Sequence, residues 1–190
     1  MNQRYERVSL VMGAVLMLTM ALLLVPRPSL AQEAASIKHD AVEALQHLYN
    51  TTPAAKALGE KAAGVLVFPS VGKGGLIVGG HYGKGALFQK SNPTQYYKTT
   101  AVSVGLQLGG QKFAYALIFM TNKDLAYLKS SEGWEVGTNP NVVLIDKGAA
   151  SALSTTTAKK GVYAFFFDQK GLMAGLGLQG TKITRIYPEN

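Results

Sequence analysis

The sequence predicts an α+β domain in which an N-terminal amphipathic helix precedes a curved antiparallel sheet, sandwich or partial barrel with one inserted helix. Three observations lead to this prediction. Apolar residues recur at helical spacing before residue 51, they alternate with small or polar residues after residue 64, and glycines recur within the alternating segments. With 190 residues and a mean hydropathy of +0.10, the chain suits one folded domain plus a short extra segment.

The predicted first helix covers Gln32 to Asn50. Its apolar side chains follow one another at helical spacing: Ala34, Ile37, Ala41, Leu45 and Leu48. Thr51-Thr52-Pro53 ends this helix, because the residue before a proline is disfavoured in the helical conformation. Pro53 is well placed to open a short second helix through residues 54–62.

Beyond Gly64 the alternating pattern predicts at least seven short strands. The candidate segments are 65–68, 76–80, 86–89, 96–107, 113–120, 142–145, 162–168, 172–179 and 181–187. Pro69 is expected to stop the first strand, His81–Gly85 to form a glycine-rich turn, Gly109-Gly110 to form a hairpin turn, and Gln169–Gly171 to form another turn.

The inserted helix is predicted around residues 124–128. Thr121 or Asn122 can cap its N-terminus, and Asp124 places a negative charge in its first turn. A polar, glycine-bearing loop is expected from Ser130 to Asn141.

Residues 1–31 have the three-part layout of a secretory signal peptide. Two arginines precede an apolar run over residues 8–25, and two prolines and the small-residue site Ser29-Leu30-Ala31 follow it. We expect export by the general secretion route and cleavage, which leaves one modestly basic domain over residues 32–190 in the periplasm or envelope. An uncleaved anchor is the alternative, because the apolar run approaches the length that spans a hydrocarbon core.

Several kinds of chemistry are excluded or disfavoured by the sequence. The absence of cysteine excludes disulfides, thiolate metal sites and cysteine nucleophiles. The phosphate-loop pattern fails at both Gly-Lys-Gly segments, no G-x-G-x-x-G opens a helix, and no G-x-S-x-G is present. His39, Glu43 and His47 share a helical spacing, but they are best explained as a solvated polar stripe. We therefore predict a protein that is not an enzyme, with no catalytic residue, metal or cofactor.

The glycines in the predicted strands have two interpretations. Glycine is normally depleted in strands, yet it recurs here at Gly79, Gly80, Gly105, Gly109, Gly175 and Gly177. The favoured interpretation is close packing and sheet curvature, because a missing Cβ lets another backbone approach. The alternative is a smooth groove that faces a ligand.

Basic residues in or beside predicted turns are the candidate binding groups. The chain has 19 Lys and Arg against 11 Asp and Glu, a net charge of +8, but its basic residues are too scattered for a nucleic-acid stripe. Lysines near apolar edges suit the anionic head groups of lipids, although each can also be an ordinary solvated side chain. The candidates for this contact are Lys73, His81, Lys84, Lys112 and Lys170.

Five glycine-rich blocks resemble the SYLF lipid-binding domain family. They are AGVLVFP (63–69), GGLIVGG (74–80), GKG (83–85), VGLQLGGQ (104–111) and GLMAGLGLQG (171–180). The resemblance implies non-enzymatic binding of phospholipids, and exported single-domain bacterial proteins are the members most similar to this chain. Eukaryotic members are described as using a basic N-terminal helix, whereas this helix carries Glu33, Asp40 and Glu43 against Lys38. We therefore expect the lysine-bearing turns to contact the membrane.

Two functions remain in competition at the level of the sequence. The favoured hypothesis is an exported module that binds anionic phospholipid head groups or a membrane surface, with no nucleic-acid partner. The alternative is a structural or assembly protein of the cell envelope, in which the glycine-rich sheet face is a protein interface, including one between copies of the chain.

Overall fold

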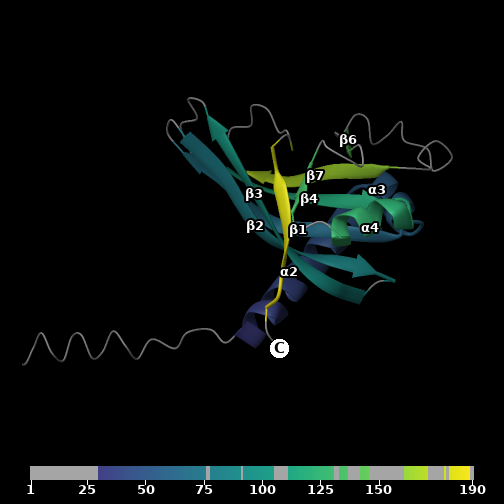
Figure 1. Cartoon of the computed structure of the whole chain (residues 1–190). Coiled ribbons are helices and arrows are strands. Elements are labelled where there is room, and N and C mark those ends of the chain that lie inside the picture. Colours follow the sequence, from purple (N-terminus) through teal and green to yellow (C-terminus); the bar gives the residue numbers. More distant parts are fainter. Residues whose placement is uncertain are drawn as a thin grey trace, which may run out of the picture.

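The computed structural model describes residues 30–75, 78–90, 92–104, 111–130, 133–136, 142–145, 161–170, 178 and 180–188 (Figure 1). Its elements, in chain order, are α2 (Leu30–Thr51), α3 (Pro53–Gly59), β1 (Gly64–Gly75), β2 (Val78–Gln89), β3 (Asn92–Val104), β4 (Gln111–Phe119), α4 (Asn122–Ser130), β5 (Trp134–Glu135), β6 (Val142–Ile145), β7 (Val162–Lys170) and β8 (Lys182–Ile186). Residues 1–29, the predicted Gly109-Gly110 turn and nearly all of the predicted 172–179 strand lie outside the described residues. Among the described helices, none combines the length and apolar character needed to cross a membrane.

The described strands form one curled sheet, in the order β5-β8-β3-β2-β1-β4-β7-β6. This half-barrel with a long N-terminal helix confirms the predicted α+β class (Figure 1). The prediction of an antiparallel sheet was wrong at one edge, where β6 runs parallel to β7. A parallel pair needs a crossover of a dozen or more residues, and the chain between Ile145 and Val162 is long enough to supply one.

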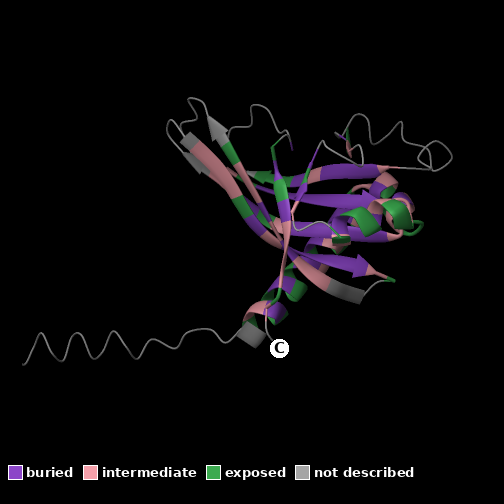
Figure 2. Cartoon of the chain, viewed as in Figure 1, coloured by how far each residue is buried: buried purple, intermediate pink, exposed green. Residues whose placement is uncertain are grey.

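Side chains on the two faces of the sheet form two separate cores. On the face that carries α2, which we call the α2 face, the helix packs on alternate residues of β1, β2, β4 and β7. The opposite face, which we call the aromatic face, is rich in aromatic rings and is also contacted by Leu125 and Leu128 of α4. Figure 2 shows the buried residues concentrated in the central strands and on the inner side of α2.

The first two helices form as their patterns predict. Of the predicted apolar residues, Ala34, Ile37, Ala41 and Leu48 are buried and Leu45 is partly buried. Ala44 is buried in addition, and α2 ends two residues before Pro53. Pro53 then occupies the first turn of α3, where a missing N–H costs no hydrogen bond.

The prediction that Pro69 stops the first strand was wrong. β1 continues to Gly75, and its register shifts between Val67 and Ser70 against β2 and between Phe68 and Val71 against β4. This irregularity is a β-bulge, a position at which a strand tolerates proline because one residue leaves the hydrogen-bond ladder.

The predicted turn at His81–Gly85 was also wrong, because β2 is continuous from Val78 to Gln89. The glycines of this segment are required by the neighbouring strand. A Cβ on Gly85 would overlap the backbone carbonyl oxygen of Val67, and a Cβ on Gly83 would lie 2.8 Å from the carbonyl oxygen of Ser70. At these positions glycine permits the close packing of β1 on β2, whereas the sequence pattern had predicted a turn for both residues.

Two local features near α4 and β5 complete the description of the fold. Thr121 caps α4, since its Oγ1 accepts a hydrogen bond from the Asp124 N–H at 3.2 Å. The predicted loop 130–141 contains the short strand β5, in which Trp134 is paired with Ile183 and packs its ring 5.7 Å from that of Phe119. A two-residue strand is too short to show a periodic pattern in the sequence, so only its pairing with β8 makes this segment a strand.

Candidate functional site: a lysine-bearing sheet face

A row of mutually opposite residues crosses six strands at one end of the sheet. Backbone pairing sets the order Lys182 (β8), Thr100 (β3), Tyr82 (β2), Gly72 (β1), Lys112 (β4) and Lys170 (β7). Residues directly opposite each other on neighbouring strands lie on the same face. The row therefore places lysine positions from both flanks of the sheet on one face, around a tyrosine and a glycine.

The adjacent row adds two further lysines to this surface. Lys84 of β2 is paired with Lys98 of β3 in the backbone register, and both share the α2 face. The side chain of Lys84 forms an ion pair with Glu33 in the first turns of α2. We call this surface the lysine face and define it by the following residues: Tyr82, Lys84, Lys98, Val102, Lys112 and Lys182.

Exposed apolar side chains lie among these lysines. Tyr82 is 50% exposed and Val102 is 78% exposed. Val102 is opposite Gly80, and Tyr82 is opposite Gly72, where an added Cβ would meet no described atom within 4 Å. In Figures 1 and 2 this end of β2 and β3 points away from α3 and α4. This end of the two strands therefore lies away from α3 and α4, whereas Tyr82 borders the first turns of α2.

A notch of about 770 Å³ borders the lysine face, between the first turns of α2 and strands β1 and β2. Gly72 and Gly83 lie along its wall, and Glu33, Asp40 and Lys84 supply its charged groups. The hydrogen bond to Glu33 raises the pKa of Lys84. Lys84 therefore stays positively charged, but its charge is partly neutralised by α2.

The five candidate residues from the sequence do not form a single cluster. Lys84 and Lys112 lie on the α2 face, and Lys170 is opposite Lys112 in the backbone register. Lys73 and His81 are opposite each other, but His81 contacts the ring of Phe113 on the aromatic face. The turn expected at His81 and Lys84 was wrong, because both residues lie within the continuous strand β2, whereas Lys112 and Lys170 lie at strand ends.

Two lysines of the site were missed by the sequence reasoning. Lys98 and Lys182 reach the lysine face through the pairing of β3 with β2 and with β8. The alternation within β3 places Lys98 and Val102 on the same face, so this local pattern could have identified them as one exposed pair. The register between strands, which joins them to Lys84, is not readable from local sequence.

His81 belongs to a partly buried polar chain on the aromatic face. The hydroxyl of Tyr115 donates a hydrogen bond to Thr99 Oγ1 at 2.6 Å, and Thr99 Oγ1 lies 3.4 Å from His81 Nε2. Because Thr99 already accepts the Tyr115 proton, its own hydroxyl hydrogen is available to a neutral imidazole. Burial, and secondarily the charge of Lys73, lower the pKa of His81.

This lowered pKa predicts a pH dependence of folding stability. A histidine whose pKa is lower in the folded state takes up a proton more readily when the protein is unfolded. The contribution of neutral His81 to the free energy of unfolding is therefore complete above pH 6.5 and is lost as the pH falls. We expect His81→Gln to lose less thermal stability than the unsubstituted protein between pH 7 and pH 5. Melting temperatures of both proteins across this pH range measure the effect. The other histidines are present in both proteins, so their contributions cancel in the difference between the two. Equal slopes for the two proteins would contradict the assignment.

Comparisons with known proteins find a matching family model and a similar protein. Residues 100–190 match the family model described as "Ysc84: Las17-binding protein actin regulator". The protein named Beta cell expansion factor A, from Aeromonas veronii, is 31% identical over 157 residues, which cover 82% of this chain and 58% of that relative. This chain thus spans somewhat more than half the length of the curated relative it matches. The matched region contains the two later glycine-rich blocks, and the match confirms the resemblance of this chain to the Ysc84 (SYLF) family over residues 100–190.

Proposed function

We propose that this SYLF-family domain binds anionic phospholipid head groups at a membrane surface through its lysine face, without chemical turnover. The observation that carries the proposal is the presence of exposed Tyr82 and Val102 among Lys98, Lys112 and Lys182 on one face. We further propose that residues 1–31 direct the protein to the periplasm or envelope, where a lipid surface is available.

The chemistry of the face suits the boundary between water and lipid. Each lysine near an anionic membrane contributes about 1 kcal/mol of attraction. Tyrosine has an apolar ring and a polar hydroxyl, so it is well suited to the head-group level. Lys84 is expected to contribute less than Lys98, because Glu33 already neutralises part of its charge.

The family assignment supports a lipid partner, since the SYLF resemblance implies phospholipid binding. Its acidic N-terminal helix distinguishes this chain from the basic helix described for eukaryotic members. We therefore assign the contact to the sheet rather than to α2. Because we propose export, we propose no actin-related role.

Vesicle co-sedimentation tests the proposal directly. We expect binding to vesicles that contain an anionic phospholipid, little binding to neutral vesicles, and a loss of binding at high salt. The screening length falls from about 10 Å at 0.1 M salt to about 3 Å at 1 M, so attraction between the lysines and the membrane should weaken strongly. Equal binding to neutral and anionic vesicles at both salt concentrations would overturn the proposal.

The apolar part of the contact can be tested separately. We expect the double variant Tyr82→Ser/Val102→Ser to bind anionic vesicles about tenfold more weakly, because the removed side chains no longer leave water on binding. Val143→Ser provides a matched control, since Val143 is 45% exposed on the edge strand β6. Unchanged binding by the double variant, measured by the same co-sedimentation, would exclude Tyr82 and Val102 from the contact.

A further inference from the structure

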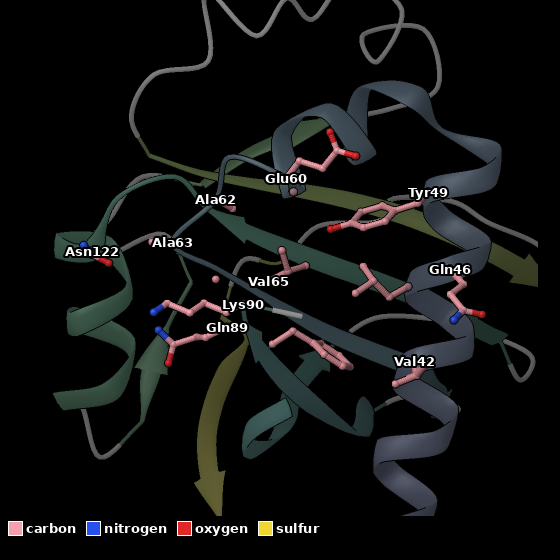
Figure 3. A pocket seen from close by; sticks show the side chains of 14 residues that line it. Val42, Gln46, Tyr49, Glu60, Ala62, Ala63, Val65, Gln89, Lys90 and Asn122 are labelled. Carbon is pink, nitrogen blue, oxygen red and sulfur yellow. The ribbon is translucent and has the colours of Figure 1, made fainter. Parts of the chain in front are cut away.

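A second hollow lies at the other end of α2, remote from the residues of the lysine face. It has a volume of about 790 Å³, is partly open to solvent, and is lined by residues of α2, α3, β1 and β2 and by the first residue of α4 (Figure 3). Binding sites for small molecules commonly have volumes of a few hundred to 1,000 Å³ and are lined mainly by apolar side chains with a few polar groups. The size of this cavity falls within that range.

The wall between α2 and the sheet is mainly apolar, with Gln46 as a polar residue on the helix side. Val42, Leu45 and Tyr49 line it from the helix, and Val65 and Phe88 line it from β1 and β2. Figure 3 shows the ring of Tyr49 directed from α2 across the cavity. Burial raises the pKa of Tyr49 to about 12, so this wall is uncharged at neutral pH.

The two ends of the cavity differ in charge. Lys90 lines one end beside Asn122, and at the same end the side-chain oxygen of Gln89 accepts a hydrogen bond from Lys129 Nζ at 2.7 Å. Glu60 of the α3 end lines the other side, where its charge acts on Tyr49. Figure 3 shows Lys90 and Gln89 on the side of Asn122, well apart from Glu60. An elongated ligand can therefore enter in a preferred orientation, with its negative end toward Lys90.

We propose that this cavity binds one single-chain amphiphile with an anionic head group, of the fatty-acid class. Its hydrocarbon chain lies between α2 and the sheet, against Val42, Val65 and Phe88, and its carboxylate lies at Lys90. The site is independent of the lysine face, because it shares no residue with that surface and takes a dissolved monomer instead of a membrane.

Calorimetry with octanoate, decanoate and dodecanoate, each below its micelle concentration, tests the ligand class. Burial of each additional CH₂ should tighten binding about fourfold, until the chain fills the cavity. Decyltrimethylammonium has a similar chain and the opposite charge, so it should bind at least about tenfold more weakly than decanoate. Absence of binding, affinity independent of chain length, or equal affinity for the cation would each overturn the proposal.

Two variants locate the ligand. Val42→Phe adds volume at the apolar wall, and we expect it to weaken decanoate binding at least tenfold, whereas Val143→Phe on the exposed edge strand should leave binding unchanged. Lys90→Gln should reduce the preference for decanoate over the cation, and Lys56→Gln on the outside of α3 is its matched control. Because Lys90 is exposed, its replacement tests the site even if Val42→Phe fails to fold.

The same variants separate this proposal from the membrane proposal. Tyr82→Ser/Val102→Ser should retain decanoate binding, and Lys90→Gln should retain vesicle binding. A protein that binds decanoate and not vesicles would refute the membrane proposal alone. Loss of decanoate binding in the Tyr82→Ser/Val102→Ser variant, with no loss in Lys90→Gln, would show that the amphiphile occupies the lysine face and would overturn the cavity assignment.

Discussion

The double variant Lys98→Glu/Lys182→Glu is expected to bind anionic vesicles about 1,000-fold more weakly than the unsubstituted protein. A lysine near an anionic membrane contributes about 1 kcal/mol, and its replacement by glutamate adds a repulsion of similar size. Two reversals therefore cost about 4 kcal/mol, which corresponds to roughly three orders of magnitude in the binding constant. A titration of vesicles against fluorescently labelled protein at low salt measures the effect.

The matched control reverses the same number of charges elsewhere. Lys56 of α3 and Lys123 of α4 are both exposed and lie outside the lysine face, toward the other end of the sheet. Lys56→Glu/Lys123→Glu changes the net charge of the protein by the same amount, so long-range attraction falls equally in both variants. If both double variants lose binding to the same extent, net charge rather than the lysine face governs the association.

Gly85→Ala is expected to lower the melting temperature by roughly 2–12 °C. A Cβ at this position would overlap the carbonyl oxygen of Val67 and lie 2.7 Å from Cδ1 of Phe68, and both atoms belong to the buried strand β1. Overpacking of a core typically costs about 1–3 kcal/mol, and each kcal/mol lowers the melting temperature of a domain of this size by about 2–4 °C. Thermal unfolding followed by circular dichroism measures the change.

Gly72→Ala is the control for this prediction. Gly72 is also a strand glycine of the same hairpin, but it is exposed and a Cβ there meets no described atom within 4 Å. Its replacement should leave the melting temperature unchanged or slightly higher, because alanine restricts the unfolded chain. A fall of similar size in both variants would show that the strands need flexible glycines rather than close backbone packing.

The helices and several strands could be predicted from local patterns. Residues of α2 bury one face at a spacing set by helical geometry, and Thr121 caps α4 through a bond to a residue three positions away. The continuous apolar runs of β4 and β7 are equally local. Local patterns were misleading in the Gly83–Gly85 region, where glycines that admit the neighbouring strand were interpreted as a turn.

The lysine face could be predicted only in part. Lys84 and Lys112 were identified from the sequence, but their neighbours Lys98 and Lys182 come from strands that are distant along the chain. The pairing of these strands depends on the whole sheet. No property of the segment around Lys98 shows that it lies opposite Lys84.

The amino-acid sequence by itself determined the α+β class, the amphipathic first helix, most strand segments and the lysine content on which the proposed function rests. The tertiary structure alone decided which lysines share a surface. The bulge between Phe68 and Val71 is the clearest case. Side chains alternate along a regular strand, so one extra residue moves Lys73 from the face of Val67 to the face of Val71, away from Lys84 and Lys112.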